Sequence, residues 1–347
     1  MSHLTEISPA AATPMPAKAT APPPAAAPSP EDLMAELRIK PRPQIFRKVP
    51  PSWQTFLSNK AGVAGLLILA VFIVAALLAP VISPYDPYRR AGKPHVQPGV
   101  EHFLGTSRQG KDIFSQLLEG GRTSLTVGFV AGLSATLIGV AIGISAGYFS
   151  GKTDEILTFF VNVSLVLPAL PLIIVFASFV EEASPTVIGL VLAFTGWGWS
   201  ARTIRTQTLA IKNREFILAA ELMGESKWRI VLREILPNMS SFVVGGFVLA
   251  TIYAILAEAG LEFIGLGSPS SVTWGTMLYW AQRAQALQTG AWWEVWPPAF
   301  AIMITGAALV LVNFAVDEIT SPQLRAARLG GRIRRFLKRR GRSVDVF

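Results

Sequence analysis

Six stretches of the chain are long, apolar and free of charged side chains. They are Ala61–Ile82, Thr123–Tyr148, Ile156–Val180, Thr186–Ala201, Met239–Ala257 and Val295–Val316. A helix needs about 20 such residues to cross roughly 30 Å of hydrocarbon, and every stretch except the fourth reaches or approaches that length. The stretches are too continuously apolar for the alternating strands of a membrane barrel. The pattern therefore predicts an all-α integral membrane protein with six transmembrane helices.

The composition supports this fold class and excludes several functions. Apolar residues make up 51% of the chain and charged residues 15%, with a mean hydropathy of +0.45, whereas a soluble domain has about 25% charged residues. The chain lacks cysteine, which excludes disulfides, cysteine nucleophiles and cysteine-bound metals. Its three histidines, His3, His95 and His102, lie outside the apolar stretches. We therefore expect no metal site and no catalytic residue, which argues against a membrane-embedded enzyme.

Lysine and arginine are unevenly divided between the two sides of the predicted bundle. The segment before the first stretch, the turn 151–155, the loop 202–238 and the tail after Val316 together carry 24. The opposite side, formed by 83–122, 181–185 and 258–294, carries seven. Positive residues gather on the cytoplasmic side of membrane proteins. Both termini are therefore expected in the cytoplasm, with 83–122 and 258–294 as external loops.

The two ends of the chain differ in composition from the middle. Residues 1–50 contain ten alanines and eleven prolines, so we expect a disordered cytoplasmic tail, either dispensable or used for docking. Residues 51–60 mix aromatic and basic side chains and are expected to lie at the membrane surface before the transmembrane domain, 61–322. The basic tail, 323–347, is expected to contact anionic lipid headgroups or, alternatively, a cytoplasmic partner.

Glycines recur every fourth residue in the second stretch, at Gly139, Gly143 and Gly147. Small residues at this spacing form one face of a helix and let a second helix approach closely. Next to them, Ala146–Thr153 is close to a phosphate-binding loop. That motif requires a preceding strand and opens a helix, whereas this segment ends a membrane helix. We therefore predict helix packing and no nucleotide site on this chain.

Prolines and acidic residues mark two further places in the spans. Pro168 and Pro171 lie inside the third stretch, where proline kinks a helix, and such a kink is either passive or part of a pathway. Glu258 and Glu262 at the outer end of the fifth stretch are the exceptions to an uncharged bundle, and we expect Glu258 to cap the helix or face the interface. Trp274 belongs to a tryptophan cluster expected to form an aromatic belt at the outer interface. With no charge inside a stretch, the pattern argues against an ion-coupled carrier.

The loop 202–238 contains the pattern of two short helices joined by a turn. Gly224 is expected to end the first helix, because glycine readily adopts the left-handed conformation there. Ser226 is expected to cap the second helix, whose apolar face ends at Pro237. A basic helix–turn–helix also suggests DNA binding, but this one lies between two membrane spans. An interfacial helix pair without a partner is the remaining alternative.

At this point the residues match a known family. Leu218-Ala219-Ala220-x-x-x-Gly224, followed by Ile235-Leu236-Pro237, resembles the EAA loop of bacterial ABC importer permeases. In that family the loop is a coupling helix that docks onto a cytoplasmic ATPase. The resemblance implies a coupling role for the loop residues Arg214, Glu215, Leu218, Ala219, Ala220, Glu221, Gly224, Ile235, Leu236 and Pro237.

Flanking motifs narrow the resemblance to the dipeptide/oligopeptide/nickel permeases, and to the second of their two permease subunits. The matching segments include Leu78–Pro87, His102–Asp112, Ala146–Gly151, Glu258–Gly267 and Trp274–Leu278. The chain departs from the family pattern at several positions: Leu218 replaces a leading glutamate, Asn162 a common acidic residue, Phe159 a common arginine and Glu262 a small residue, and the segment 316–325 also differs.

The resemblance implies a type I ABC importer permease in the bacterial plasma membrane, forming half of a translocation pathway. Its partners would be a second homologous permease, two ATPase domains that bind ATP and magnesium, an external substrate-binding protein and membrane lipid, but no nucleic acid. Peptides are the expected cargo, with oligosaccharides or nickel as alternatives. Residues that would line the pathway or contact the binding protein are Pro168, Pro171, Glu258, Glu262 and Trp274.

Overall fold

The computed structural model describes residues 56–168, 171–172, 174–175, 179 and 183–320. Within these residues the secondary structure is helical, with one isolated β-bridge between Thr106 and Asp112 and no strand. The prediction of an all-α protein is confirmed for this part of the chain. The expectations for the two terminal tails, and for most of 169–182, concern residues outside the described ranges.

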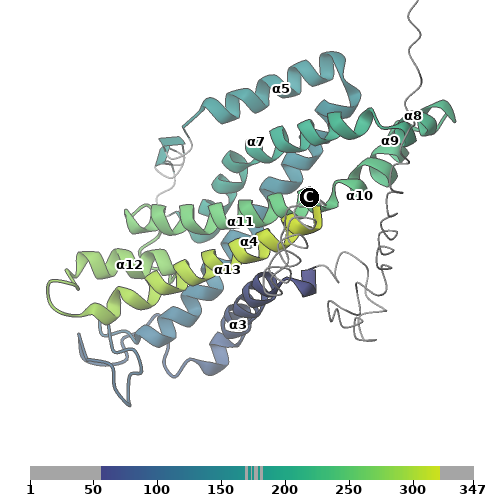
Figure 1. Ribbon diagram of the computed structural model, residues 1–347. Coiled ribbons are helices and arrows are strands. Elements are labelled where there is room, and N and C mark those ends of the chain that lie inside the picture. The colour runs from purple at the N-terminus through teal and green to yellow at the C-terminus, as the bar shows by residue number, and fades with distance from the viewer. Residues whose placement is uncertain (1–55, 169–170, 173, 176–178, 180–182, 321–347) are drawn as a thin grey trace, which may run out of the picture. The chain divides into compact units, whose positions relative to one another are not determined.

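Among the described residues, five helices are long and apolar enough to cross a membrane. They are α3 (Lys60–Ile82), α4 (Ile113–Phe149), α7 (Pro185–Lys212), α11 (Ser240–Phe263) and α13 (Trp296–Thr320). Figure 1 shows them as one bundle. They correspond to five of the six predicted spans.

Three of these helices extend at least six residues beyond one end of the apolar runs that predicted them. Helix α4 begins at Ile113, ten residues before Thr123, because the Asp112 carboxylate accepts a hydrogen bond from the Ser115 amide and caps the helix. Helix α7 continues to Lys212 instead of ending at Ala201, and α11 continues to Phe263. Polar and charged residues end an apolar run without ending a helix, since arginine, glutamine, lysine and glutamate are good helix formers.

The third predicted span is not a continuous kinked helix as far as it is described. Helix α5 covers Gly151–Val166 and ends before Pro168. Leu167 is extended, with φ −66° and ψ 126°, as a residue before proline prefers. The 16 residues of α5 extend about 24 Å at 1.5 Å per residue, which is short of a full crossing. The prediction of a helix kinked at Pro168 is therefore wrong for the described part.

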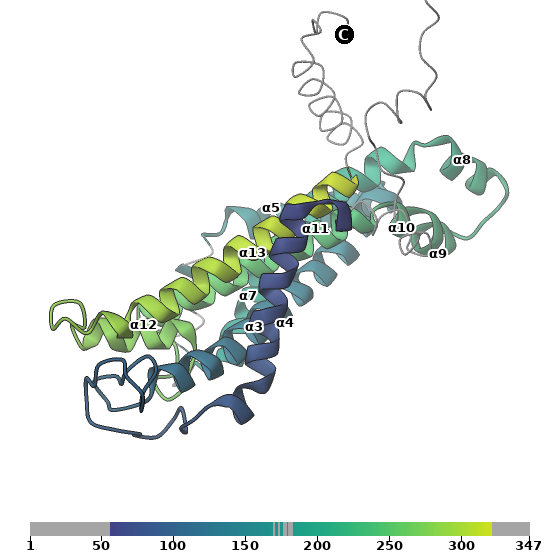
Figure 2. The same ribbon diagram turned by 60° about the horizontal axis from the view of Figure 1, so that its bottom comes forward.

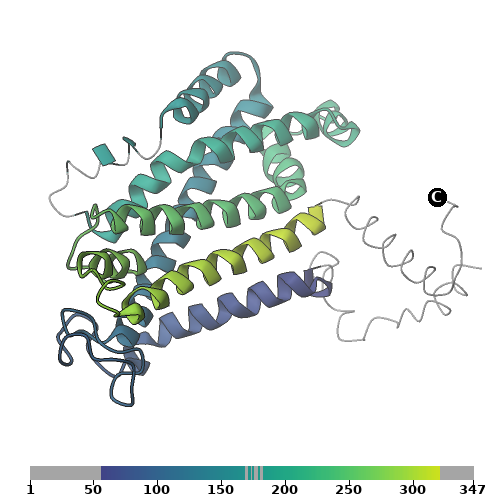
Figure 3. The ribbon, with the colours of Figure 1, turned by 60° about the vertical axis from the view of Figure 1, so that its left-hand side comes forward.

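The long helices pack in a simple order. Helix α3 packs on α13, α13 on α11, α11 on α7 and α7 on α5, as Figure 3 shows. Helix α4 runs across this layer and contacts both α7 and α11. In Figure 2 the short helices α8 and α9 lie at one end of the bundle, and α12 (Trp274–Arg283) lies at the other with the loop 83–112. We refer to these as the α8 end and the α12 end.

The predicted glycine row lies where α4 meets α7. A Cβ atom would come within 2.5 Å of Ser200 Cβ at Gly139, within 2.6 Å of the Ala201 carbonyl oxygen at Gly143, and within 2.7 Å of Thr208 Cβ at Gly147. Such distances leave no room for a side chain, so the two backbones are in close contact. Gly151 shares the four-residue spacing but has φ +62° and nothing near its Cβ position; it forms the turn between α4 and α5.

Two tryptophans expected in an aromatic belt are buried at the α12 end. Trp274 is 1% exposed, packs against α4 beside Gly120 and Gly121, and donates a hydrogen bond from Nε1 to the Leu117 carbonyl. Trp293 is 5% exposed and donates to the Thr106 carbonyl in the loop 83–112. The prediction of an aromatic belt is therefore wrong for these two, because their indole N–H groups have partners inside the protein.

Candidate functional site

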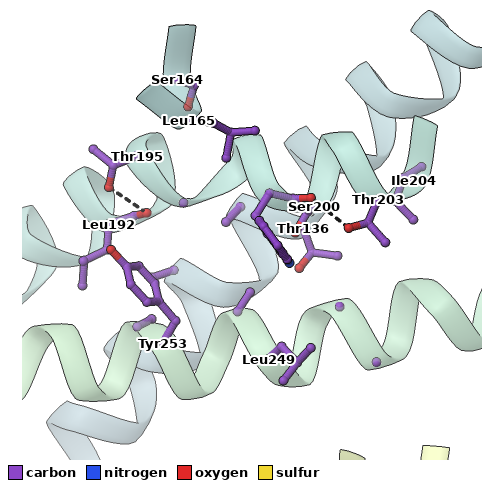
Figure 4. A pocket seen from close by; sticks show the side chains of 18 of the residues that line it. Thr136, Ser164, Leu165, Leu192, Thr195, Ser200, Thr203, Ile204, Leu249 and Tyr253 are labelled. Carbon is purple, nitrogen blue, oxygen red and sulfur yellow. Dashed lines mark hydrogen bonds between the residues drawn. The ribbon is translucent and has the colours of Figure 1, made fainter. Parts of the chain in front are cut away.

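A cavity of about 730 Å³ lies among α4, α5, α7 and α11. Figure 4 shows its wall from close by. Apolar side chains such as Leu192, Ile204 and Leu249 contribute most of that wall, together with the aromatic rings of Trp199 and Tyr253. Its size is in the range of pockets that hold or pass small molecules.

Hydroxyl groups supply most of the polar atoms of the cavity wall. They belong to Thr136, Ser164, Thr195, Ser200, Thr203, Ser241 and Tyr253. The Thr136, Thr195 and Thr203 hydroxyls donate to carbonyl oxygens of their own helices, at 2.8, 2.9 and 3.1 Å. Their oxygens therefore face the cavity mainly as acceptors.

Among the described lining residues, Asp317 is the single charged one. A wall with so little fixed charge holds a polar solute weakly, and it therefore suits passage better than storage.

The sequence-predicted pathway residues lie in two separate places. Pro168 lines the cavity where α5 ends. Pro171 is exposed and is not among the described residues of the wall. Glu258, Glu262 and Trp274 lie away from the cavity, at the α12 end. Spacing along the sequence does not predict which of these five residues lie close together, because helix packing determines which of them are neighbours.

Glu258 and Glu262 are buried, with 0% and 1% exposure, which corrects the expectation that Glu258 is a cap or interface residue. Ser124 of α4 donates to Glu258 Oε1 at 3.2 Å, and Thr273 donates to Glu262 Oε2. The Trp274 amide in turn donates to the Ser124 hydroxyl oxygen. Buried carboxyl groups need such donors. The result is a polar network that fastens α12 to α4 and α11.

The loop at the α8 end contains four short elements. These are α8 (Glu215–Leu222), α9 (Lys227–Ile230), the π-helical turn η2 (Val231–Ile235) and α10 (Leu236–Asn238). Gly224 follows α8 with φ +78°, which confirms the predicted left-handed helix end.

Two details of the prediction for this loop are wrong. Ser226 precedes α9, but its side chain makes no capping hydrogen bond. Pro237 lies inside α10 and ends nothing, since the chain enters α11 at Ser240.

One face of this helix pair is buried and the other is exposed. Ile217, Ile230 and Ile235 are at most 1% exposed and pack in one cluster with residues of α4 and α7. At the opposite side, Leu222 is 89% exposed and Met223 is 79% exposed. We call these two residues the apolar tip. Neighbouring exposed large apolar side chains are typical of surfaces that contact another protein or a membrane.

The residues with an implied coupling role divide between these faces. Ile235 is buried, Ala220 and Leu236 are half-buried, and the exposed members are Arg214, Glu215, Leu218, Ala219, Glu221, Gly224 and Pro237. The motif therefore contributes both the inner contacts of the helix pair and its outer surface.

Comparison with known proteins gives this arrangement a family. A family model described as "Binding-protein-dependent transport system inner membrane component" matches residues 139–331, more than half of the chain. The chain belongs to this family. A second model, the N-terminal TM domain of oligopeptide transport permease C, matches residues 52–98. The chain is thus a multi-pass membrane permease, and transport, not catalysis, is the activity of its family.

Named relatives of this permease cover most of its length. The dipeptide transport system permease protein DppC of Bacillus subtilis is 34% identical over 79% of this chain and 85% of its own length. The oligopeptide transport system permease protein OppC of Mycobacterium bovis is 34% identical over 80% of this chain and 95% of its own. A solved inward-facing structure of the MetNI methionine ABC transporter shares the fold, with a TM-score of 0.50 at 19% identity over 59% of this chain and 94% of that one.

Sequence reasoning missed an ion pair that joins α5 to α7 in this permease. Arg205 donates to both carboxylate oxygens of Asp154, at 2.6 and 2.8 Å. These hydrogen bonds hold the pKa of Asp154 below its usual range, so its carboxylate is ionised at neutral pH. Arg202 donates to the Asn162 amide oxygen at 2.9 Å and joins the same two helices. The available signal was charge alone, because Asp154 and Arg205 lie in two segments that the sequence predicts as loops on the same side of the membrane.

Proposed function

We propose that this permease is one of two transmembrane subunits of an ATP-driven ABC importer that carries peptides across the bacterial plasma membrane. The observation that carries the proposal is the connection between two surfaces. The helix pair with the apolar tip packs directly on α4 and α7, and these two helices line the cavity. A protein that moves the helix pair therefore also moves the cavity wall.

The α8 end faces the cytoplasm in this proposal, and the α12 end faces outward. The division of 24 and seven positive residues supports that orientation. The five candidate spans, with residues 156–180 as the sixth, then leave both termini in the cytoplasm. The network around Glu258, Glu262 and Trp274 shapes the outward end, where an external substrate-binding protein delivers cargo.

The apolar tip serves as the docking point for an ATPase. Two cytoplasmic ATPase domains bind ATP and magnesium and hydrolyse the nucleotide, so this chain needs no cofactor of its own. A second, homologous permease supplies the other half of the pathway.

The segment Ala146–Thr153, which is close to a phosphate-binding loop in sequence, covers the end of α4, Ser150 and the start of α5. The Ser150 hydroxyl oxygen accepts a hydrogen bond from Lys212.

Peptides are the proposed cargo because the named relatives are dipeptide and oligopeptide permeases. The hydroxyl-rich wall with little fixed charge is compatible with peptides of many sequences, since it provides few contacts that select a side chain. Oligosaccharides and nickel are the alternative cargoes for an importer of this type.

Purification of the tagged protein from native membranes tests the proposed assembly. In mild detergent, mass spectrometry is expected to find a second permease and ATPase subunits with it. Crosslinking from a residue placed at Leu222 is expected to label an ATPase subunit. A stable homo-oligomer that repeatedly purifies without any ATPase would contradict the proposal and favour an ion-coupled carrier or a channel.

A further inference from the structure

The coupling loop of this chain is attached to the bundle by a polar contact that the family motif does not imply. Leu218 stands at the motif's leading position and is 48% exposed. Glu221, one turn further along α8, is also exposed, but it contacts the bundle. Its Oε1 atom accepts a hydrogen bond from the Tyr148 hydroxyl of α4 at 3.1 Å. This bond joins α8 to the last turn of a helix that lines the cavity.

Several contacts hold Tyr148 in place. Tyr148 is 4% exposed and belongs to the same buried cluster as Ile217 of α8. Lys212, the last residue of α7, donates from Nζ to the Tyr148 carbonyl oxygen at 2.7 Å and to the Ser150 hydroxyl at 2.8 Å. The same ammonium group lies 5.6 Å from the centre of the Tyr148 ring. The ends of α4 and α7 therefore share one fixed point.

A second set of contacts continues from this point to the cavity. Gly147 lies against Thr208, so α4 and α7 are in close contact just beside Tyr148. One turn before Thr208, Arg205 makes its two hydrogen bonds to Asp154 at the start of α5. At the other end of α5, Ser164, Leu165 and Pro168 line the cavity. A displacement of α7 is thereby passed to a third wall of the cavity.

Helix α8 also contacts the bundle through apolar side chains. Ile217 and Ala220 pack in the apolar cluster, and apolar packing has no preferred direction. Such packing resists compression, but it lets one helix slide along another. A hydrogen bond depends on the position and angle of its donor and acceptor. The Tyr148–Glu221 bond therefore supplies directional contact that the apolar cluster lacks.

We infer that Tyr148 and Glu221 are positioning residues that transmit the movement of α8 to α4 and α7, and that Arg205 and Asp154 carry it on to α5. This inference rests on the proposed function, since it presupposes an ATPase that moves α8. The residues touch no substrate. They determine how much of the movement of α8 in each ATPase cycle is transmitted to the cavity wall.

Tyr148→Phe tests the link in the complete transporter reconstituted into vesicles. This variant keeps the buried ring and removes the hydroxyl. The readout is the uptake of a radiolabelled mixture of short peptides divided by the ATP hydrolysed in the same sample. We expect this ratio to fall roughly three- to ten-fold, the range that the loss of one hydrogen bond implies, while the ATPase still turns over. A lesion that merely unfolds the complex would lower uptake and hydrolysis together and leave the ratio unchanged.

Glu221→Gln and Glu221→Ala give the matched pair for the other partner. The glutamine keeps an oxygen that accepts from Tyr148 and is expected to retain most of the ratio, whereas alanine is expected to match Tyr148→Phe. The double variant Tyr148→Phe with Glu221→Ala is expected to be no worse than either single change. Glu225→Ala is the control, because Glu225 pairs with Arg229 in the adjoining turn at 3.0 Å.

A wild-type ratio in Tyr148→Phe, or additive losses in the double variant, would overturn the inference and leave the importer function standing. If the wild-type complex itself shows no ATP-dependent uptake of the peptide mixture, the proposed function fails and the inference fails with it. The two failures are therefore distinguished by the wild-type sample alone.

Discussion

Two acidic residues of α11 have a structural role that their positions in the sequence do not reveal. Glu258 and Glu262 follow an apolar run, and each lies buried on the face of α11 that meets α4 and α12. Each carboxyl group has one hydroxyl donor, Ser124 of α4 for Glu258 and Thr273 at the start of α12 for Glu262, which reduces the cost of burial. These donors are separated from the carboxyl groups by up to 134 residues in the chain, so spacing in the sequence carries no sign of the network.

Thr273 is the donor whose loss we expect to cost most. Its hydroxyl donates to Glu262 and also accepts from the Thr276 amide at 3.0 Å, which caps α12. Thr273→Val removes both bonds and leaves a buried carboxyl group without its donor, so the free energy of unfolding should drop by about 1–3 kcal/mol. Thermal unfolding in detergent measures the change. Thr273→Ser keeps the hydroxyl and should stay close to wild type; equal losses in both variants would contradict this role.

The Asp154–Arg205 pair makes a pH-dependent contribution. Because the folded state lowers the pKa of Asp154, the pair stabilises the protein above the ordinary aspartate pKa and loses this effect as the pH falls through the lowered value. Asp154→Asn should therefore cost about 1 kcal/mol at neutral pH. The difference between wild type and variant should vanish in strong acid. Unfolding at several pH values checks this, and a difference that grows on acidification would refute it.

At the scale of helices, the sequence predicted which segments span but not where each helix ends. Apolar length identified five helices because the hydrocarbon layer requires it. Helices α4, α7 and α11 continue past their apolar runs, since backbone hydrogen bonds do not depend on apolar side chains. The sequence predicts a kink at Pro168 inside a span, yet α5 ends before it. A proline inside an apolar run is compatible with a kinked helix and with a helix end, and the packing around the proline determines which of the two forms.

The α4–α7 contact gives a direct test at this scale. At Gly143 a Cβ atom would meet the Ala201 carbonyl oxygen at 2.6 Å and Ile204 Cβ at 2.8 Å. Gly143→Ala should therefore force the helices apart and lower the free energy of unfolding by about 1–3 kcal/mol. Gly306→Ala is the matched control, since nothing lies near its Cβ position in α13. Equal stability of the two variants would show that the close packing is not required.

The turn after α8 is the element on which the proposed coupling depends. Gly224 has φ +78° and open space around its Cβ position. A side chain at this position is therefore disfavoured by the backbone conformation and not by a clash within this chain. It would clash only with a docked partner. Gly224→Trp should abolish uptake while the protein still reaches the membrane, as immunoblotting of membrane fractions would show. Gly224→Asn tolerates this conformation and should keep much of the activity. Normal uptake by the tryptophan variant would exclude a docking role for this turn.

At the scale of the whole molecule, the described helices form a bundle with a cavity and two ends of different character. The α8 end carries an exposed apolar tip, and the α12 end is tied together by a buried polar network. The sequence predicted the helix pair and the Gly224 turn of the first end, because these signals are local, but the predicted Ser226 cap and the helix end at Pro237 were wrong. The second end and the cavity depend on contacts among α4, α5, α7, α11 and α12, which no local pattern contains.

The central claim is that ATP hydrolysis by partner subunits drives import through this permease. The most direct measurement is uptake of radiolabelled short peptides by vesicles that contain the purified complex and its binding protein. ATP is supplied on the side that the α8 end faces. We expect accumulation that needs both ATP and the binding protein and that persists when an uncoupler collapses the ion gradients. Uptake that proceeds without ATP but stops with the uncoupler would contradict the account.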